Sequence, residues 1–375
     1  MKHENYIRGR GAQLNPPNRY LAQSLTLYTD DLATDEERRE LLTHNPRTRL
    51  VEVFPKTILN KVNSPDLGFS WSMNPYQGCE HGCIYCYARN THEYWGYSAG
   101  KDFEQIILIK RNAPELLRKA LLHKKWKPQV INLAGNTDIY QPAERSLKIT
   151  RQCLMVFAEL KHPVSLITKN ALVLRDLDIL AELAQQNLVW VTLSLTTLRQ
   201  SVKSIMEPRT SSVRAVLRAL EELSAADVPV NINMAPIIPA INDDEILELV
   251  KTVATRGAKQ VSYIVVRLNG HNGMLFEDWL RKNFPDRADK VLNRIKSMHG
   301  GKVNDTMYGR RMKGEGEWAT LIHRQMELAR RRYLPPEGMP PLDFSLFEKA
   351  RDSALNMKQS STQPDLFSAH SENSF

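Results

Sequence analysis

Residues 78–89 read Gly78-Cys79-Glu80-His81-Gly82-Cys83-Ile84-Tyr85-Cys86-Tyr87-Ala88-Arg89. This stretch holds three of the four cysteines of the chain, spaced C-x3-C-x2-C. Thiolates are the usual ligands of iron–sulfur clusters, and a cube of four irons held by three cysteines keeps one iron without a protein ligand. Such an iron can bind a substrate or cofactor, so the spacing predicts chemistry as well as structure. Gly78 and Gly82 suit a loop that turns tightly around a cluster.

Two other uses of these cysteines are open from the residues alone. Three cysteines together with His81 or His92 could hold a zinc ion. Most zinc sites of that kind pair two short knuckles some distance apart, whereas these cysteines lie within eight residues. A disulfide framework is the weaker alternative, because three cysteines cannot pair evenly and four in 375 residues are sparse for a secreted chain.

The cysteine stretch resembles the signature of the radical S-adenosylmethionine (SAM) superfamily, in which an aromatic residue, here Tyr85, precedes the third cysteine. The resemblance implies a 4Fe-4S cluster on Cys79, Cys83 and Cys86, with SAM chelating the fourth iron through its amino and carboxylate groups. It also implies reductive cleavage of SAM to methionine and a 5'-deoxyadenosyl radical, which abstracts a hydrogen from a substrate. The electron would come from a donor such as flavodoxin or ferredoxin. The protein itself would orient the cofactors and exclude water.

The composition is that of an ordinary globular protein, with 42% hydrophobic and 25% charged residues. A chain of 375 residues has room for one barrel-sized domain with extensions. It contains no apolar run of about 18 residues, and its N-terminal residues are polar, so we expect a cytoplasmic protein. The formal net charge of +9 and a pI near 9.3 are compatible with a polyanionic partner such as nucleic acid.

Short apolar runs alternate with amphipathic segments from about residue 66 to 270. The pattern predicts strands at 69–73, 130–134, 164–168, 188–194, 228–234 and 261–266, and helices at 114–123, 145–160, 174–185, 213–226 and 244–254. Nearly continuous apolar character favours parallel strands buried on both faces. The alternation predicts parallel βα units in an open sheet or a barrel. The superfamily resemblance implies an α/β fold with an incomplete, TIM-like (β/α)6 barrel.

Four segments are predicted along the chain. Residues 1–65 form a packed N-terminal extension of loops and a short helix, 66–270 the partial barrel, and 271–355 a basic helical extension packed over it. Residues 356–375 are rich in Ser, Gln, Asn and Thr, which predicts a disordered tail. The apolar run 105–110 is expected to be an edge strand or a hairpin.

Chemistry in parallel α/β folds gathers at the carboxyl ends of the strands. Asp138, Glu144, Lys169 and Ser194 follow predicted strands, and with Tyr85 they are candidates to bind SAM. A carboxylate suits the amine and the ribose hydroxyls of SAM, and lysine suits its carboxylate. The alternative for Asp138 and Glu144 is structural, because they precede the 145–160 helix, where acids stabilise the first turn.

Several strand-end segments resemble the spore photoproduct lyase-like branch of the superfamily, also called DNA repair photolyase-like. They are Thr137-Asp138-Ile139-Tyr140-Gln141-Pro142-Ala143-Glu144, Glu207-Pro208-Arg209 and Pro236-Ile237-Ile238-Pro239-Ala240-Ile241-Asn242-Asp243. Residues 9–12 and 308–318 resemble one bacterial subfamily of that branch. The resemblance implies action on DNA, in repair or modification.

One departure limits that resemblance. Spore photoproduct lyase uses a further cysteine as a hydrogen-atom donor, and the only other cysteine here is Cys153. It lies among apolar residues of the predicted 145–160 helix, which is typical of a buried structural cysteine. The lyase reaction therefore does not follow from the sequence. Tyrosines are the other candidates for a radical relay: Tyr76 and Tyr140, with Tyr85 and Tyr87.

The tail carries a second signal. Gln363-Pro364-Asp365-Leu366-Phe367 resembles the short motif that binds the bacterial sliding clamp, with Gln363, Leu366 and Phe367 as the contacting side chains. The sequence thus favours a radical-SAM enzyme, with possible lyase-like activity, that acts on DNA. Two alternatives are a radical-SAM enzyme acting on a protein or small molecule, and a zinc-stabilised binding protein without catalysis.

Overall fold

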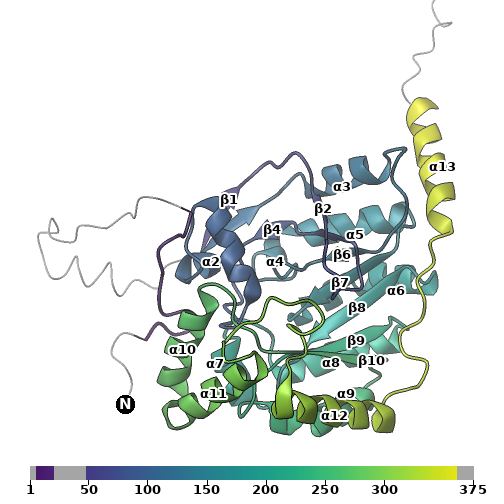
Figure 1. Cartoon of the computed structure of the whole chain (residues 1–375). Coiled ribbons are helices and arrows are strands. Elements are labelled where there is room, and N and C mark those ends of the chain that lie inside the picture. The colour runs from purple at the N-terminus through teal and green to yellow at the C-terminus, as the bar shows by residue number, and fades with distance from the viewer. Residues whose placement is uncertain (1–5, 21–47, 361–375) are drawn as a thin grey trace, which may run out of the picture.

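The structure is a computed structural model that describes residues 6–20 and 48–360 (Figure 1). A seven-stranded sheet, in the order β10-β9-β8-β7-β6-β3-β2, forms the centre of this described part. Its parallel strands are β3 (Trp71–Met73), β6 (Ile131–Leu133), β7 (Val164–Thr168), β8 (Val189–Ser194), β9 (Val230–Ile237) and β10 (Gln260–Val265). β2 (Leu59–Lys61) pairs antiparallel with β3. Because β10 and β2 are separate edges, the barrel is incomplete, as predicted.

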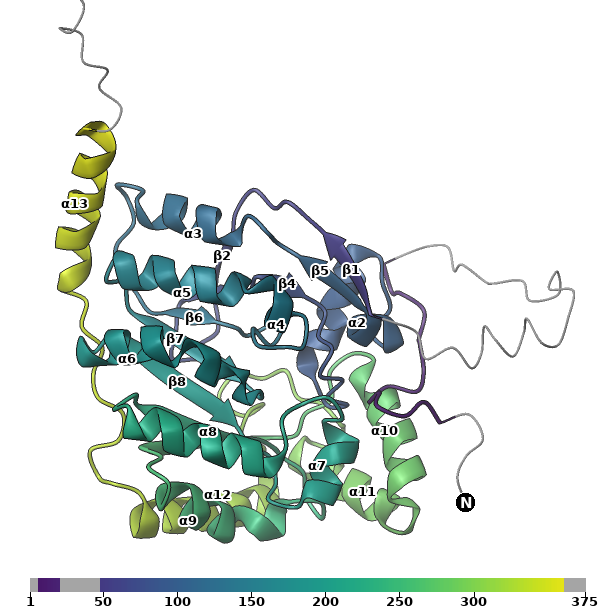
Figure 2. The same ribbon diagram turned by 180° about the vertical axis from the view of Figure 1, so that it is seen from behind.

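Helices cover the outer face of the sheet, as Figure 2 shows from behind. They are α3 (Ala113–Leu121), α5 (Ile149–Glu159), α6 (Leu177–Gln185), α8 (Val213–Ala225) and α9 (Ile246–Ala254). β8 points towards the end of the molecule that carries α2 (Lys101–Gln105) and α10 (Asn272–Asn283), and α13 (Leu346–Ser360) projects from the opposite end. The carboxyl ends of the strands therefore open towards α2 and α10.

The two faces of the sheet differ in polarity. Leu133, Leu166, Val191 and Val230 lie in one cross-strand row, and all four are fully buried in the apolar core. Several of the alternate positions are polar, although Ile167 and Trp190 also lie there. Ser165 donates to the Asn132 amide oxygen at 3.1 Å, and Asn231 donates to Thr192 at 3.3 Å. The expectation of apolar burial on both faces is therefore wrong, since the inner face carries hydrogen-bonding side chains.

Several predicted elements differ in the structure. The 1–65 extension, predicted as loops and a short helix, contains the strand β2 and a strand at 49–52. The 145–160 helix divides into α4 (Glu144–Leu147) and α5, because Lys148 takes a left-handed φ of 53°. The run 105–110 is β5 (Ile106–Ile109), the buried middle strand of a small sheet between β1 (Arg49–Glu52) and β4 (Tyr76–Gln77). α13 continues to residue 360, so residues 356–360 of the predicted tail are helical, and the rest of that tail lies outside the described residues.

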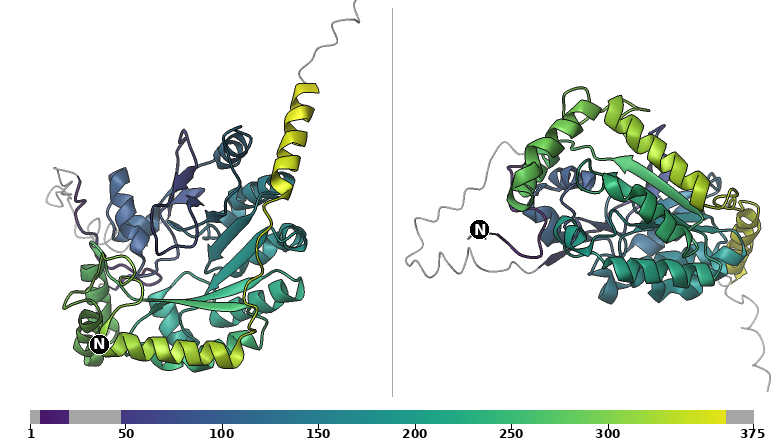
Figure 3. Two further views of the ribbon diagram at one scale, coloured as in Figure 1. Left: turned by 45° about the vertical axis from the view of Figure 1, so that its right-hand side comes forward. Right: turned by 90° about the horizontal axis from the view of Figure 1, so that it is seen from below.

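The C-terminal extension packs against the barrel as helices α10, α11 (Ala288–Met298) and α12 (Gly316–Tyr333), and Figure 3 shows α12 running along one side of the sheet. Residues 299–315, which connect α11 to α12, form a strap across the open side of the sheet. The Val265 amide donates to Met312 at 2.9 Å, and Arg311 pairs with Asp66, in the turn between β2 and β3, at 2.6 Å. The strap therefore links the two edges of the open sheet.

None of the helices within residues 6–20 and 48–360 is long and apolar enough to cross a membrane. The sliding-clamp-like motif at 363–367 and much of the N-terminal extension, where a short helix is predicted, lie outside the described residues.

Candidate active site at the cysteine loop

The cysteine loop follows β4 at the carboxyl end of the sheet. Gly78 and Gly82 have φ values of 80° and 67°, and a Cβ on Gly78 would lie 2.5 Å from the Ile106 carbonyl oxygen. Glycine is therefore required at Gly78 by both conformation and space. Cys79 and Cys83 are each 7% exposed, and Cys86 precedes the 3-10 helix η2 (Tyr87–Trp95). The loop thus places two buried thiols, Cys79 and Cys83, and the partly buried Cys86 in one tight turn.

The donor set fits a 4Fe-4S cluster. Burial raises the pKa of the Cys83 and Cys86 thiols, and the neighbouring cysteines raise it further. Bound iron would offset this cost, because a coordinating thiol is deprotonated outright. A cube spreads its ligands over separate irons, so the three sulfurs need not converge on one point. Cys79, Cys83 and Cys86 are thus the residues that would hold the cluster.

The two histidines of the zinc alternative contact other side chains. His81 lies with Nδ1 3.3 Å from Asp138 and Nε2 3.3 Å from the Asn170 amide. His92 packs between Tyr97 and Phe103. Across the described ranges, no three His, Cys, Asp or Glu side chains group as ligands of a single metal ion.

A buried ion pair supports the loop from behind. Arg89 and Glu104 are fully buried and 2.5 Å apart. Arg89 also donates to the Cys83 carbonyl at 3.0 Å, while Glu104 accepts from the Gly11 and Ala12 amides at 3.1 and 2.8 Å. The pair therefore fastens the N-terminal segment to the cysteine loop. Sequence reasoning missed this arrangement, although it singled out residues 9–12.

Gly11 makes the closest contact between these segments, and its replacement by alanine tests the contact. A Cβ on Gly11 would lie 1.8 Å from the Gly82 carbonyl oxygen, so the backbones must separate. We expect Gly11→Ala to lower the free energy of unfolding by about 1–3 kcal/mol and to reduce the iron retained after reconstitution. Gly68→Ala is the matched control, because no atom lies within 4 Å of its Cβ position. Equal iron content and stability in both variants would contradict this packing.

Lys169 and Tyr85 lie beside the cysteines. The Lys169 ammonium is 5.8 Å from the centre of the Tyr85 ring and makes no hydrogen bond or ion pair to any residue that the structure describes. Burial opposes its charge, but nearby Cys83 and Glu207 raise the pKa of Lys169 above its ordinary value. The Tyr85 hydroxyl donates to Glu207, which also pairs with Lys203. Lys169 is therefore a free cation next to the predicted cluster.

The remaining predicted SAM-binding residues are more enclosed. Ser194 is 2% exposed at the end of β8. Asp138 accepts from Thr168 and from the Lys169 amide, each at 2.7 Å. Burial raises the pKa of this carboxyl, yet His81 and these hydrogen bonds hold it at about 2. Asp138 thus ties the ends of two strands together, and its contact with SAM stays a prediction.

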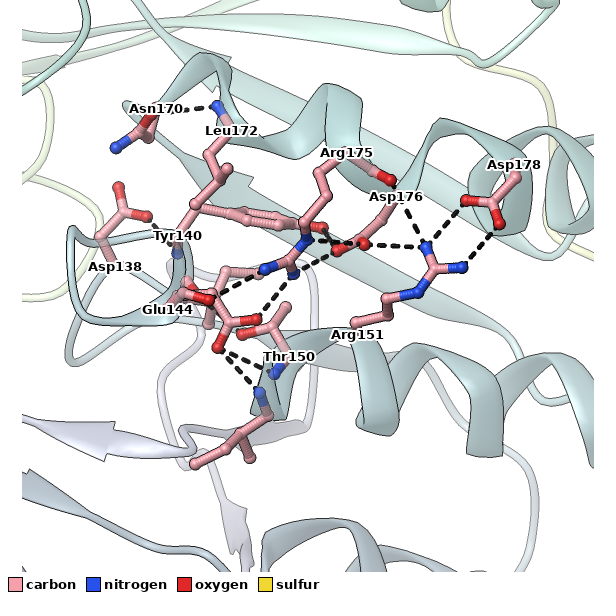
Figure 4. A network of polar contacts seen from close by, with 12 residues as sticks. Asp138, Tyr140, Glu144, Thr150, Arg151, Asn170, Leu172, Arg175, Asp176 and Asp178 are labelled. Atoms are coloured by element: carbon pink, nitrogen blue, oxygen red, sulfur yellow. Dashed lines mark hydrogen bonds and ion pairs between the residues drawn. The ribbon is translucent and has the colours of Figure 1, made fainter. Parts of the chain in front are cut away.

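Glu144 lies in a buried polar network, shown in Figure 4. Its carboxylate accepts from the Ile149 and Thr150 amides at 3.0 and 3.1 Å and pairs with Arg175 at 2.7 Å. These contacts provide acceptors for backbone amides in the first turn of α5. This is the structural role that the sequence also suggested for Glu144. Binding of SAM by Glu144 stays a prediction.

The tyrosines proposed as relays differ in exposure. Tyr76 and Tyr140 are fully buried, with hydroxyls that donate to Glu144 and, at 3.0 Å, to Asp176. Tyr85 is 8% exposed, whereas Tyr87 is 49% exposed and donates to the Gly135 carbonyl after β6. Tyr87 is therefore the most accessible of them. Cys153 is fully buried in the core, as expected for a structural cysteine.

Arg267 follows β10 and was missed by sequence reasoning. Burial and the nearby Arg311 lower the pKa of Arg267, while Tyr87 and Asp66 act against that shift. Its guanidinium is partly buried and has no hydrogen-bond or ion-pair partner within 6–20 and 48–360. A lone arginine in a loop carries no local sequence signal, so only the fold reveals this position.

Comparisons with known proteins concern the family and the fold of the chain. The radical SAM superfamily model matches residues 73–253. An uncharacterized protein of Mycobacterium tuberculosis (strain ATCC 25618 / H37Rv) is 34% identical over 242 residues, which cover 64% of this chain and 71% of the relative. An uncharacterized protein of Methanocaldococcus jannaschii is 26% identical over 250 residues, covering 67% and 89%.

The fold is similar to that of solved spore photoproduct lyase structures. One, complexed with dinucleoside spore photoproduct, has a TM-score of 0.58 and 18% identity, covering 76% of this chain and 80% of that one. A variant with bound AdoMet and the same dinucleoside has a TM-score of 0.57 and 17% identity, with the same coverage. At this identity the likeness concerns the fold.

Proposed function

Because the chain belongs to the radical SAM superfamily, we propose that it is a radical SAM enzyme whose substrate is DNA, which it repairs or modifies. When bound, the 4Fe-4S cluster and SAM supply a 5'-deoxyadenosyl radical that abstracts a hydrogen atom from the substrate. The residues of the chain have three tasks: they hold the cofactors, position the substrate and exclude water.

The cofactor-binding tasks are assigned to residues of the cysteine loop and the strand ends. Cys79, Cys83 and Cys86 hold the cluster. Lys169 is proposed to bind the carboxylate of SAM, because it is a partly buried cation without a hydrogen-bond or ion-pair partner in the described structure. Tyr85 packs beside it and is fixed by Glu207. Ser194 ends the neighbouring strand and is proposed to donate to SAM.

Arg267 is the observation that carries the choice of a nucleic-acid substrate. Leaving a partly buried cation without a counter-ion costs free energy, which an incoming anion recovers. Guanidinium groups bind phosphate with good geometry, and Arg311 lies nearby. The net charge of +9 also favours binding of a polyanion such as nucleic acid. Spore photoproduct lyase, whose fold is similar, has been solved with a dinucleoside.

Tyr87 is proposed to face the substrate. It directly follows Cys86 and is half-exposed, and both Lys169 and Arg267 act on its hydroxyl electrostatically. A tyrosine at this position can relay a hydrogen atom between substrate and cofactor. The buried Cys153 cannot reach a substrate, so the proposal does not extend to the cysteine-dependent lyase reaction.

Salt-dependent binding to DNA tests the substrate class. We expect the affinity for a short DNA duplex to fall steeply with salt, because each phosphate contact releases condensed counterions. Arg267→Gln is expected to weaken binding about tenfold and to reduce the salt slope by about one. Arg118→Gln, which alters a surface pair with Glu159, is the control and should change neither. Absent or salt-insensitive binding by the natural chain would favour a protein or small-molecule substrate.

The sliding clamp is a further proposed partner. Gln363, Leu366 and Phe367 lie outside the described residues, so support comes from the motif alone. α13, which precedes the tail, projects from the end of the molecule opposite α2 and α10 (Figure 2). A clamp held there would leave the proposed substrate side open.

A further inference from the structure

We infer that an acidic one-electron carrier protein docks on an aromatic surface formed by Tyr20, Tyr94 and Trp95, and that its electron reaches the cysteine loop through Tyr97, His92 and Phe103. The inference rests on the proposed cluster but is independent of the proposed DNA substrate. In this step the carrier is oxidised by one electron and the cluster is reduced by one, and no bond is made or broken.

The electron must come from another molecule. The chain has four cysteines, and three of them lie in the cysteine loop. The fourth, Cys153, is fully buried and alone, so it cannot hold a second iron–sulfur cluster. The surface through which a carrier approaches is therefore a functional site in its own right.

A row of aromatic rings leads outward from the cysteines. Phe103 is 1% exposed and packs in one cluster with Cys79 and Cys86, and its carbonyl accepts from the Cys79 amide at 2.8 Å. The His92 ring meets Phe103 edge-on with 5.6 Å between centroids, and stacks on Tyr97 at 5.1 Å. Burial lowers the pKa of His92 to about 4, so the ring is neutral at physiological pH.

The row ends at an exposed aromatic surface. Tyr97 is partly exposed and lies two residues from Trp95, which is 44% exposed. Tyr94 is 72% exposed and stacks on Tyr20, which is 56% exposed, with centroids 5.0 Å apart. Exposed aromatic side chains gathered in one place are enriched at protein interfaces. Electron-transfer complexes are among the smallest interfaces, so a patch of this kind is sufficient.

Charge at the surface favours an acidic partner over a basic one. The Arg19 guanidinium lies 5.7 Å from the Tyr20 ring and is 43% exposed, whereas its partner Glu93 is fully buried. Lys101 begins α2, the helix that carries Phe103, and Asp102 follows it, with its carboxylate engaged by Asn15 and the Ser98 amide. The net charge of +9 steers acidic proteins towards the molecule as a whole. The route runs through His92 in η2 and Phe103 in α2.

The double variant Tyr94→Ala/Trp95→Ala tests the surface with flavodoxin as the probe. Both side chains are exposed, so the fold should be retained. We expect the dissociation constant for flavodoxin to rise about tenfold or more, and cluster reduction by reduced flavodoxin to slow by a similar factor. Reduction by dithionite should stay within about twofold of the natural chain. The control is Leu321→Ala/Leu328→Ala on α12, which also removes exposed apolar side chains (45% and 55%) and should change nothing.

Three outcomes would overturn the inference: flavodoxin affinity that is the same in both double variants, a natural chain that binds no flavodoxin, or a Tyr94→Ala/Trp95→Ala variant that loses DNA affinity instead. The last result would make the aromatic surface a nucleic-acid platform. Failure of the proposed cluster chemistry is distinguishable, because dithionite would then yield no 5'-deoxyadenosine in the natural chain either.

Discussion

Replacing Cys83 with alanine is expected to abolish the brown colour of the reconstituted protein and to reduce 5'-deoxyadenosine formation to background, a loss of about a thousandfold or more. Cys83 is 7% exposed in a loop whose backbone is fixed by Gly78, Gly82 and Arg89, so no other side chain can move in to replace the thiol. The measurement is anaerobic reconstitution with iron and sulfide, followed by dithionite, SAM and a product assay. Cys79→Ala and Cys86→Ala should behave alike.

Cys153→Ala is the matched control, since it removes a buried cysteine that the cluster does not need. It should keep the full iron content and SAM cleavage while losing some stability, because it leaves a small cavity in the core. A Cys83→Ala protein that still bound four irons and cleaved SAM would show that the ligands are assigned wrongly. A colourless, zinc-loaded natural chain that left SAM intact would remove the radical chemistry altogether.

Glu104→Gln is expected to have the largest effect on stability, lowering the free energy of unfolding by about 3–5 kcal/mol. The substitution leaves Arg89, which is fully buried, without its counter-ion. It also removes an acceptor: one carboxylate oxygen becomes an NH2 group, which only donates, so either the Gly11 or the Ala12 amide loses its partner. Denaturant unfolding of the apoprotein measures the change without involving the cluster.

Glu52→Gln provides the comparison for this prediction. Glu52 pairs with Arg111 on the surface, where both side chains are about half-exposed, so its loss should cost less than about 1 kcal/mol. Equal effects of the two substitutions would mean that Glu104 does not support a buried charge. A large loss of iron in Glu104→Gln alone would connect the ion pair to the cysteine loop.

The parts of this protein that could be predicted from the sequence have local patterns. The strands at 164–168 and 188–194 are runs of apolar residues, and they coincide with β7 and β8 within one residue. The three cysteines of the loop could likewise be recognised from one short stretch of sequence. The polar inner face could also have been predicted, because Asn132, Ser165 and Asn231 each alternate with apolar neighbours, as in a strand with one polar face. The prediction of two apolar faces followed instead from the high overall apolar content of these strands.

Long-range contacts could not be predicted in the same way. Glu104 meets Gly11 across 93 residues, and neither position differs locally from a surface glutamate or a flexible glycine. Glu144 was found from the sequence, but its role was not. An acidic residue at a strand end can bind a cofactor or accept hydrogen bonds from the amides of a helix, and its contacts with Ile149 and Thr150 show the second use. Arg267 is conspicuous only once the fold has left it without a partner.

The link between Arg311 and Asp66 has a consequence for how large a molecule can enter. This ion pair joins the strap to the turn between β2 and β3 through side chains, not through the backbone hydrogen bonds of a sheet. This link closes off the open side of the sheet between Asp66 and Arg311, so a large molecule would approach from the end where the strands finish. For the proposed DNA substrate, a base inside a duplex would then have to rotate out of its stack to reach the reacting centre. Damaged or unpaired bases, which leave the stack at the lowest cost, would therefore be preferred.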